Sequence, residues 1–299
     1  MSIYSFGRRD LNVTTNIAKM IGELMEKKDS KVWARDLKTG IAVSDNKLVN
    51  ACYRMSAVQK RLFNFAIASL HSRKFAKHGE ALVNLEDYAF LTGKTLKEAI
   101  RTVRREVRSM SLLQVININY KERKSLNPRQ NVAILAREKA GTNEISSLSY
   151  KNFFQEIEFI HDTSGAFVWF KFSDWLLPYI ELLEFKFSQV PLLEIGKLGS
   201  FYSLRIYDFC MASQPIGKKH TRSFSLSELR ISMGFVDDKE NMYLRWADFR
   251  KRCLVEPIAE LNEKTLDTWD FRVTGRGRIE KQVIITCTVS DQLDLFKEE

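Results

Sequence analysis

The chain has 299 residues, of which 44% are hydrophobic and 28% are charged, and its net charge at pH 7 is +10. These proportions are typical of a globular protein long enough for two domains, and they exclude an intrinsically disordered chain. The excess of cations favours polyanionic partners. The sequence has no apolar stretch long enough to span a bilayer and no recognisable signal peptide, so we expect a cytoplasmic protein.

The start of the chain differs in character from the rest. Residues 1–45 are polar and mixed in charge, and we interpret them as an N-terminal arm with one candidate helix at residues 17–27. Ser56 is a suitable N-cap for a longer helix predicted over residues 57–73. A first domain is therefore predicted over residues 46–150.

The first domain contains a short helix at residues 85–91, a turn at Gly93 and an amphipathic helix over residues 95–110. At about 100° per residue, the apolar side chains of the second helix fall on one stripe and its cations on a separate arc. Strands at residues 113–120 and 131–136 follow, and they flank a basic loop suited to phosphate contact. The candidate DNA-binding residues are Lys94, Lys97, Arg101, Arg104, Arg105 and Arg108 around the helix, and Lys121, Arg123 and Lys124 in the loop.

A second domain is predicted over residues 151–290. We expect it to open with a hairpin, whose strands are residues 153–160 and 166–172, followed by a helix at residues 174–183. An apolar helix at residues 200–213 comes next.

The second domain then repeats the pattern of the first, because residues 226–234 have the Leu-to-Gly spacing of residues 85–93. A second basic helix is predicted over residues 241–262 with a kink at Pro257, and a glycine- and arginine-containing wing follows it. The candidate DNA-binding residues are Lys218 and Lys219 in a basic loop, Arg245, Arg250, Lys251 and Arg252 on the helix, and Arg276 and Arg278 in the wing.

A short helix, a turn, a basic helix and a two-stranded wing make the unit that places one helix in the major groove of DNA. The two copies predict an α+β fold of two tandem winged-helix domains with an N-terminal extension. They also predict a protein that grips duplex DNA at two places.

The sequence offers little for catalysis. Gly93-Lys94-Thr95 ends like a phosphate-binding loop, but the position five residues before Gly93 is Tyr88, where that pattern needs glycine. The histidines form no His-x-His pair for a metal-assisted nicking enzyme. We predict no active site, no metal site and no cofactor. The scattered cysteines, which we expect to be buried and reduced, are Cys52, Cys210, Cys253 and Cys287.

Residues 291–299 form a tail whose central residues combine a glutamine with large apolar side chains. Such a segment is either the last turn of the fold, docked on its own domain, or a linear motif that anchors in another protein's pocket. The pentapeptide resembles the motif by which bacterial replication proteins bind the sliding clamp, and we favour that interpretation. The candidate partner-binding residues are Gln292, Leu293, Asp294, Leu295 and Phe296.

Several segments are weak family signals when taken one by one, but their order along the chain is specific. They are Asn46-Lys47-Leu48-Val49, Gln59-Lys60-Arg61-Leu62, Leu204-Arg205-Ile206-Tyr207, Leu229-Arg230 with Gly234, Phe249-Arg250-Lys251-Arg252, Glu256-Pro257-Ile258, Glu260-Leu261-Asn262 and Gly275-Arg276-Gly277-Arg278. With these segments, residues 46–290 resemble the iteron-binding plasmid replication initiators (Rep proteins) of bacteria, most strongly after Leu204.

The resemblance implies two winged-helix domains, binding to repeated origin sites, and recruitment of host replication factors without catalysis. In that family the C-terminal domain makes the main groove contacts, and the N-terminal domain adds a second contact and forms the interface of dimers. The arm and the clamp-like tail depart from the shorter members, which leaves dimer control and helicase loading open. The implied groove residues are Arg245, Arg250, Lys251 and Arg252.

Our hypothesis is a plasmid replication initiator that binds direct repeats with both winged helices. Its predicted partners are double-stranded DNA, the sliding clamp, and a host initiator, helicase and chaperone, with an equilibrium between monomer and homodimer. The alternative is a plasmid-encoded transcriptional repressor that uses the same helices, and the two roles could coexist. A nicking enzyme is a third hypothesis, from a different class.

Overall fold

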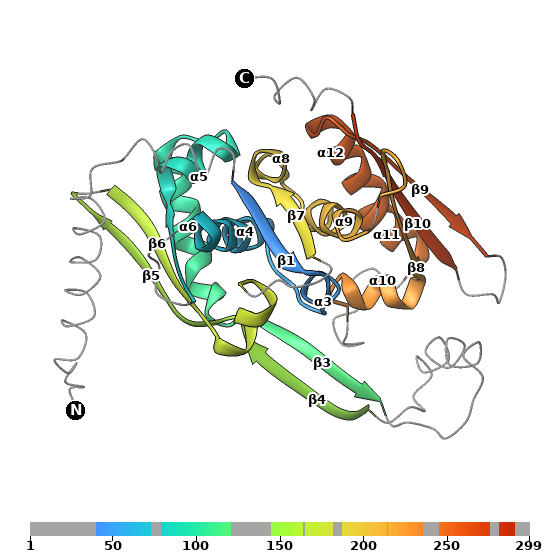
Figure 1. Ribbon diagram of the computed structural model, residues 1–299, viewed down its shortest axis with the longest axis horizontal. Helices are drawn as coiled ribbons and strands as arrows, with labels where there is room; N and C mark the ends of the chain where they lie inside the picture. Colours follow the sequence, from blue (N-terminus) through green and yellow to red (C-terminus); the bar gives the residue numbers. More distant parts are fainter. Residues whose placement is uncertain are drawn as a thin grey trace.

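The structure is a computed structural model that describes residues 40–72, 79–120, 145–163, 165–181, 187–213, 215–235, 245–275 and 281–290. Within these residues two units lie on either side of helix α9 (Phe201–Met211) (Figure 1). Some sequence predictions fall outside the described residues. These are the arm before residue 40, the tail with residues 292–296, the strand at 131–136, and the cations Lys121, Arg123, Lys124, Arg276 and Arg278.

The first described strand, β1 (Ile41–Asp45), pairs antiparallel with β7 (Phe187–Pro191). The arm predicted to reach residue 45 is therefore shorter, because the backbone of residues 41–45 finds its hydrogen-bond partners in a sheet. A short helix, α3 (Asn46–Val49), follows directly.

Helix α4 (Ala57–Ser72) forms the centre of the first unit and confirms the helix predicted over residues 57–73. It begins with a reciprocal cap, in which the Ser56 hydroxyl accepts from the backbone N–H of Gln59 (3.2 Å) and the Gln59 side-chain oxygen accepts from that of Ser56 (2.8 Å). Leu62 and Phe65 are fully buried, because α4 is surrounded by other elements.

A three-stranded antiparallel sheet covers α4, in the order β2 (Glu80–Asn84), β6 (Gly165–Phe172) and β5 (Phe154–Asp162). The hairpin of β5 and β6 was predicted, but it was expected to open the second domain. Because β6 pairs with β2 and buries Val168 and Phe170 in the core of the first unit, the hairpin belongs to that unit. The domain boundary predicted near residue 150 therefore lies too early in the chain.

Helix α5 (Leu85–Thr92), a turn at Gly93 and helix α6 (Leu96–Met110) form the helix–turn–helix of the first unit, as predicted. Gly93 has a φ of 64°, a left-handed conformation that glycine adopts without steric penalty. The next helix begins with a capping box made by Thr95 and Glu98.

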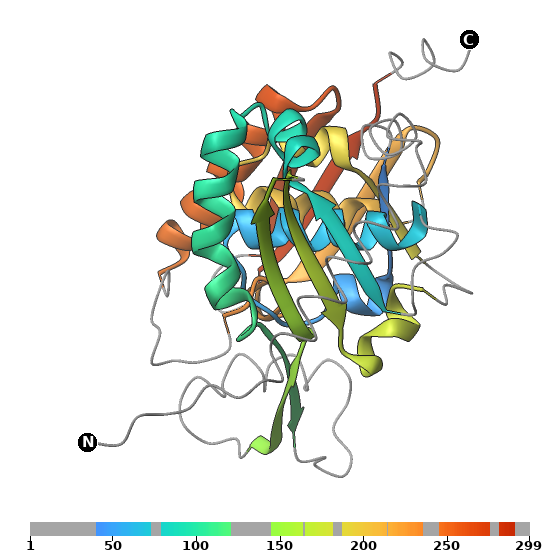
Figure 2. The same ribbon diagram turned by 90° about the vertical axis from the view of Figure 1, so that its left-hand side faces the viewer.

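Strand β3 (Gln114–Tyr120) follows α6 and pairs antiparallel with β4 (Ile145–Asn152). Together they form a wing that projects from the body of the protein (Figures 1 and 2). The sequence placed the second wing strand at residues 131–136, whereas the described partner of β3 comes later in the chain. The alternating polar and apolar residues at 147–150 are the signal that the prediction missed.

After β6 the chain forms a 3₁₀ helix, η2 (Asp174–Tyr179), where an α-helix over residues 174–183 was predicted. Pro178 has no backbone N–H, so the α-helical hydrogen bond to the carbonyl of Asp174 cannot form. The chain then passes through β7 and a short helix, α8 (Leu192–Gly196), before it reaches α9.

The second unit has the same plan. Helix α10 (Leu226–Ser232) precedes α11 (Trp246–Arg250). The sheet has the order β8 (Lys219–Ser225), β10 (Gln282–Thr288) and β9 (Thr268–Thr274), with β8 before the two helices in the chain and the other strands after them. The basic loop predicted at residues 218–222 is largely strand β8, because its backbone pairs with β10 from Lys219 onward.

Helix α11 continues into a π-helical turn, η3 (Lys251–Val255), and then into α12 (Glu256–Lys264). The interruption or kink predicted at Pro257 is this π-helical turn. Because Pro257 has no N–H to donate to the carbonyl four residues earlier, the preceding turn widens while the helix continues.

One hydrophobic core runs through both units of the described chain, and α9 lies at its centre. The ring of Tyr207 packs 5.3 Å from that of Trp269, and the ring of Phe209 packs 5.0 Å from that of Phe224. Helix α9 also contacts α4 and β7 of the first unit. The same helix therefore completes the cores of both units.

Candidate nucleic-acid interface

Helix α6 presents a cationic face to solvent. Ala99 and Val103 are fully buried, which sets the rotation of the helix about its axis. The cations lie on the opposite side, as the spacing predicted. The α6 cationic face consists of the exposed residues Lys97, Arg101, Arg104, Arg105 and Arg108, with Lys94 exposed in the preceding turn.

The α6 cationic face is hollowed. Its long side chains and Ile100 line a shallow groove of about 460 Å³. At one edge the guanidinium of Arg104 lies 5.8 Å from the centre of the Phe159 ring on β5. This contact holds one cation of the face against the sheet.

The two acidic side chains of α6 are held by hydrogen bonds and an ion pair, and the five cations of the α6 cationic face outnumber them. Glu98 accepts hydrogen bonds from the backbone N–H (3.1 Å) and hydroxyl (2.9 Å) of Thr95, and these bonds lower the pKa of its carboxyl. Glu106 accepts from the hydroxyl of Ser56 at 2.8 Å and pairs with Arg105 at 3.5 Å. The face therefore keeps the positive charge that a phosphate backbone requires.

The wing of the first unit adds a cation that the sequence analysis missed. Lys151 on β4 is exposed, and its ammonium lies 5.5 Å from the ring centre of Trp175. The indole N–H of Trp175 in turn donates to the carbonyl of Asn152 at 2.8 Å. Lys151 was missed because the second wing strand was placed elsewhere.

Helix α11 and η3 present the second cationic surface. Phe249 and Cys253 are fully buried, which turns the neighbouring cations outward. The α11 cationic face consists of the exposed residues Arg245, Arg250, Lys251 and Arg252.

Two members of the α11 cationic face have partners. The guanidinium of Arg250 lies 5.6 Å from the ring centre of Phe271 on β9, which directs it towards the wing. Arg252 pairs with Glu256 at 3.1 Å. An exposed pair four residues apart contributes only about 0.3–0.5 kcal/mol, so Arg252 can exchange this partner for a phosphate.

The wing of the second unit contributes cations that were not predicted. Arg272 on β9 is exposed, and the ammonium of Lys281 lies 5.9 Å from the ring centre of Trp246 at the start of α11. The sequence contained a signal for Arg272, because alternation along β9 turns every second side chain to the outer face of the sheet.

The structure does not bring Lys218 and Lys219 to this surface. In the register of β8 and β10, Lys219 lies opposite Thr288, at the end of the sheet away from the wing turn between β9 and β10. Both lysines are exposed, but a strand of this length separates them from the turn by roughly 20 Å. The prediction relied on their position shortly before the second helix–turn–helix in the sequence, and that position does not bring them near the wing turn.

The two recognition helices lie along the same edge of the molecule. In Figure 2, α6 (green) and the start of α11 (orange) both lie along the left-hand edge. A rod-shaped polyanion could therefore contact both faces at once.

The described residues contain no group of three or more His, Cys, Asp or Glu side chains able to hold a metal ion. Cys52, Cys210, Cys253 and Cys287 are free and buried, as predicted. Burial raises the pKa of Cys52 to about 11 and that of Cys210 to about 12, which keeps both thiols protonated. Within the described part of the chain, no helix is both long and apolar enough to cross a bilayer.

Two helix–turn–helix units, each followed by an antiparallel wing, define a tandem winged-helix protein. Residues 41–211 match the family model described as "Initiator Replication protein, WH1", and residues 225–286 match "Initiator Rep protein, WH2". The chain belongs to this family of initiator Rep proteins, which confirms the resemblance and the predicted fold class. The first match includes β5, β6 and α9, in agreement with the strand pairing.

A solved structure supports the fold. The chain is similar to the Pi initiator protein, solved in complex with iteron DNA, with a TM-score of 0.63 and 22% sequence identity over 85% of this chain and 99% of that one. It also matches domains 2–3 of RctB with a TM-score of 0.36 and 11% identity over 81% of this chain and 83% of that one. The second score is too low to support an argument.

Proposed function

We propose that the chain is a plasmid replication initiator that binds repeated origin sequences (iterons) with both winged helices. One observation carries the proposal, namely the two exposed cationic faces, each beside a wing and on helices that lie along one edge of the molecule (Figure 2). Family membership supports it, as does the shared fold with an initiator solved in complex with iteron DNA.

In this mechanism phosphate contacts supply affinity, and a few side chains supply sequence discrimination. Lysines and arginines that neutralise phosphates release counterions, and that release makes binding steeply dependent on salt. An arginine that donates two hydrogen bonds to guanine discriminates by about 1–3 kcal/mol. We propose this role for Arg245, at the start of the second recognition helix, and for Arg250, beside its wing.

The experiment that tests the proposal has two parts. Wild-type protein should select a repeated sequence from a random duplex library and bind it more tightly than a scrambled duplex. A circle that carries the gene and its flanking DNA, and no other replicon, should then replicate in a bacterial host. Selective binding without replication would favour the repressor, and relaxation of supercoiled circles by the purified protein would indicate a nicking enzyme.

The tail extends the proposal to a protein partner. Residues 292–296 fit the motif through which bacterial replication proteins bind the sliding clamp, although they lie outside the described residues. Replacing Leu295 and Phe296 with alanine should abolish capture of purified clamp and leave DNA binding unchanged, because the anchoring side chains are lost while both cationic faces remain. If clamp does not bind the intact chain, this part of the proposal is wrong.

Host initiator, helicase and chaperone contacts, a monomer–homodimer equilibrium and repression of the chain's own promoter complete the proposal. The two DNA-binding roles use the same cationic faces. They differ in whether replication follows binding, so the replication assay separates them.

A further inference from the structure

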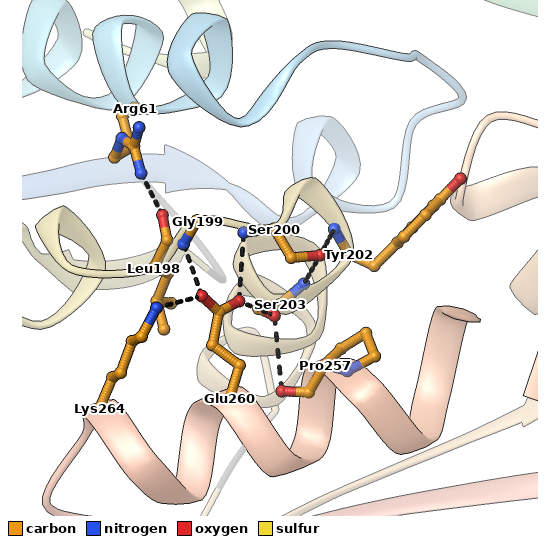
Figure 3. A network of polar contacts seen from close by, with 9 residues as sticks. All are labelled: Arg61, Leu198, Gly199, Ser200, Tyr202, Ser203, Pro257, Glu260 and Lys264. Carbon is orange, nitrogen blue, oxygen red and sulfur yellow. Dashed lines mark hydrogen bonds and ion pairs between the residues drawn. The ribbon is translucent and has the colours of Figure 1, made fainter. Parts of the chain in front are cut away.

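The contact between the two units is built around α9, and we call it the α9 junction. At its N-terminal end Ser200 caps the helix, since its hydroxyl accepts from the backbone N–H of Tyr202 at 3.2 Å. The remaining backbone donors at this end point towards α12 of the second unit. They meet one carboxylate, that of Glu260 (Figure 3).

Glu260 joins the second recognition helix to α9. One of its oxygens accepts from the backbone N–H of Gly199 (2.7 Å), and the other accepts from the backbone N–H of Ser200 (3.1 Å) and the hydroxyl of Ser203 (2.6 Å). Lys264, one turn later on α12, donates to the same carboxylate at 2.7 Å. Charged hydrogen bonds of this kind are the strong ones, and the negative charge also suits a helix N-terminus.

The network continues into the first unit. Arg61 on the central helix α4 donates from its guanidinium to the carbonyl of Leu198, the residue before Gly199 (Figure 3). Arg61 is buried, with only 5% of its surface exposed. A chain of hydrogen bonds therefore runs from α4, through the start of α9, to Glu260 on α12.

A second arginine joins the same elements farther along α9. Arg205 is fully buried and donates to the hydroxyl of Tyr53, to the carbonyl of Ala51 (3.1 Å) and to the carbonyl of Ser232 (2.6 Å). The first two acceptors belong to the first unit, and Ser232 ends α10 of the second. Its guanidinium also lies 4.2 Å from the ring centre of Tyr53. The guanidinium thus bonds both units at once.

We propose that Glu260 is a positioning residue for DNA binding. It fixes the second recognition helix against α9, so that the distance between the two cationic faces is constant. The inference rests on the proposed function. It assigns to Glu260 no contact with DNA, since its carboxylate is occupied within the α9 junction. Arg61 and Arg205 complete the coupling on the side of the first unit.

The geometry explains why the effect reaches the DNA. Glu260 lies on α12, which continues without interruption from α11 and η3, so a shift at Glu260 moves Arg245 and Arg252. Two linked binding modules gain affinity only while both can engage together. A looser junction lowers the effective concentration of one module at its half of the site, although each module still binds alone.

The test uses full-length Glu260→Gln, with Lys264→Met as the milder variant. The probes are a full duplex selected by the wild-type protein, and a duplex that keeps only the half protected by the second unit. Glutamine has one acceptor oxygen and no charge, so it cannot keep all the bonds of Glu260. We expect binding to the full duplex to weaken about tenfold, or ~1.4 kcal/mol, and binding to the half duplex to stay within about twofold.

A spacing series separates positioning from stability. Insertions of one to five base pairs between the two halves should weaken wild-type binding progressively, since they rotate one half around the helix axis. Glu260→Gln should be less sensitive to the same insertions. Equal losses on full and half duplexes, or an unchanged spacing preference, would overturn the inference. If wild-type protein selects no duplex, the proposed function fails instead.

Discussion

The salt dependence of DNA binding gives the most direct test of the α6 cationic face. Lys97, Arg101 and Arg108 lie within one narrow stripe of α6 and are exposed. Alanine has the highest helix propensity, so replacing all three with alanine should leave the helix intact. The matched control replaces Lys218 and Lys219, which are equally exposed but lie at the far end of the second sheet.

The size of the effect follows from counterion release. Each phosphate contact contributes about −0.9 to the slope of log K against log salt, so three lost contacts should reduce the slope by about 2.7. Between ~50 and ~200 mM salt, wild-type affinity should then fall about 40-fold more than that of the triple variant. The control should keep nearly the wild-type slope.

Fluorescence anisotropy with a labelled duplex over a salt series measures both slopes. Circular dichroism of the triple variant should show unchanged helix content. If the triple variant keeps the wild-type slope, α6 does not meet phosphate, and the first unit has another role. If the control loses slope in proportion to its two charges, binding responds only to net charge, and the assignment of a surface is wrong.

Three further predictions concern specificity and stability. Arg245→Ala should cost about 1–3 kcal/mol in binding to the selected duplex and little on a scrambled one; equal loss on both in mobility shifts would mean that this side chain meets only phosphate. Asp208→Asn should lower the free energy of unfolding by about 3–5 kcal/mol in urea, since it leaves the buried ammonium of Lys60, 2.8 Å away, without its counter-ion; a smaller loss would imply that Lys60 reaches water. Gly234→Ala should lower the melting temperature more than Gly217→Ala, because both have positive φ but only at Gly234 would the new Cβ lie 2.7 Å from the carbonyl oxygen of Tyr53; equal shifts would contradict this close contact.

Local signals in the sequence were sufficient for the recognition helices. The turn at Gly93, the helix that follows it and the apolar stripe of that helix depend on residues close together in the chain, and the structure confirms all three. The exposure of the cations follows from the same periodicity. Their role in DNA binding stays a prediction.

Contacts between distant segments could not be predicted in the same way. Strand alternation predicted the hairpin of β5 and β6, but it carries no information about which other strand the hairpin joins. The pairing of β3 with β4 skips residues 121–144, where a shorter loop was expected. Glu260 and Gly199 are separated by 61 positions, and no local pattern marks them as partners.

The chemistry of the α9 junction argues for a selected geometry and not for stability alone. Replacing a buried ion pair by apolar side chains of similar volume is often neutral or stabilising, so burial of Lys60, Asp208 and Arg205 is a poor way to gain stability. Buried polar groups penalise every arrangement that leaves them unpaired, whereas apolar groups tolerate sliding. A protein that must place two recognition helices on one duplex needs a fixed contact between its two units. The cost of unpairing buried polar groups fixes that contact, and these charges lie there.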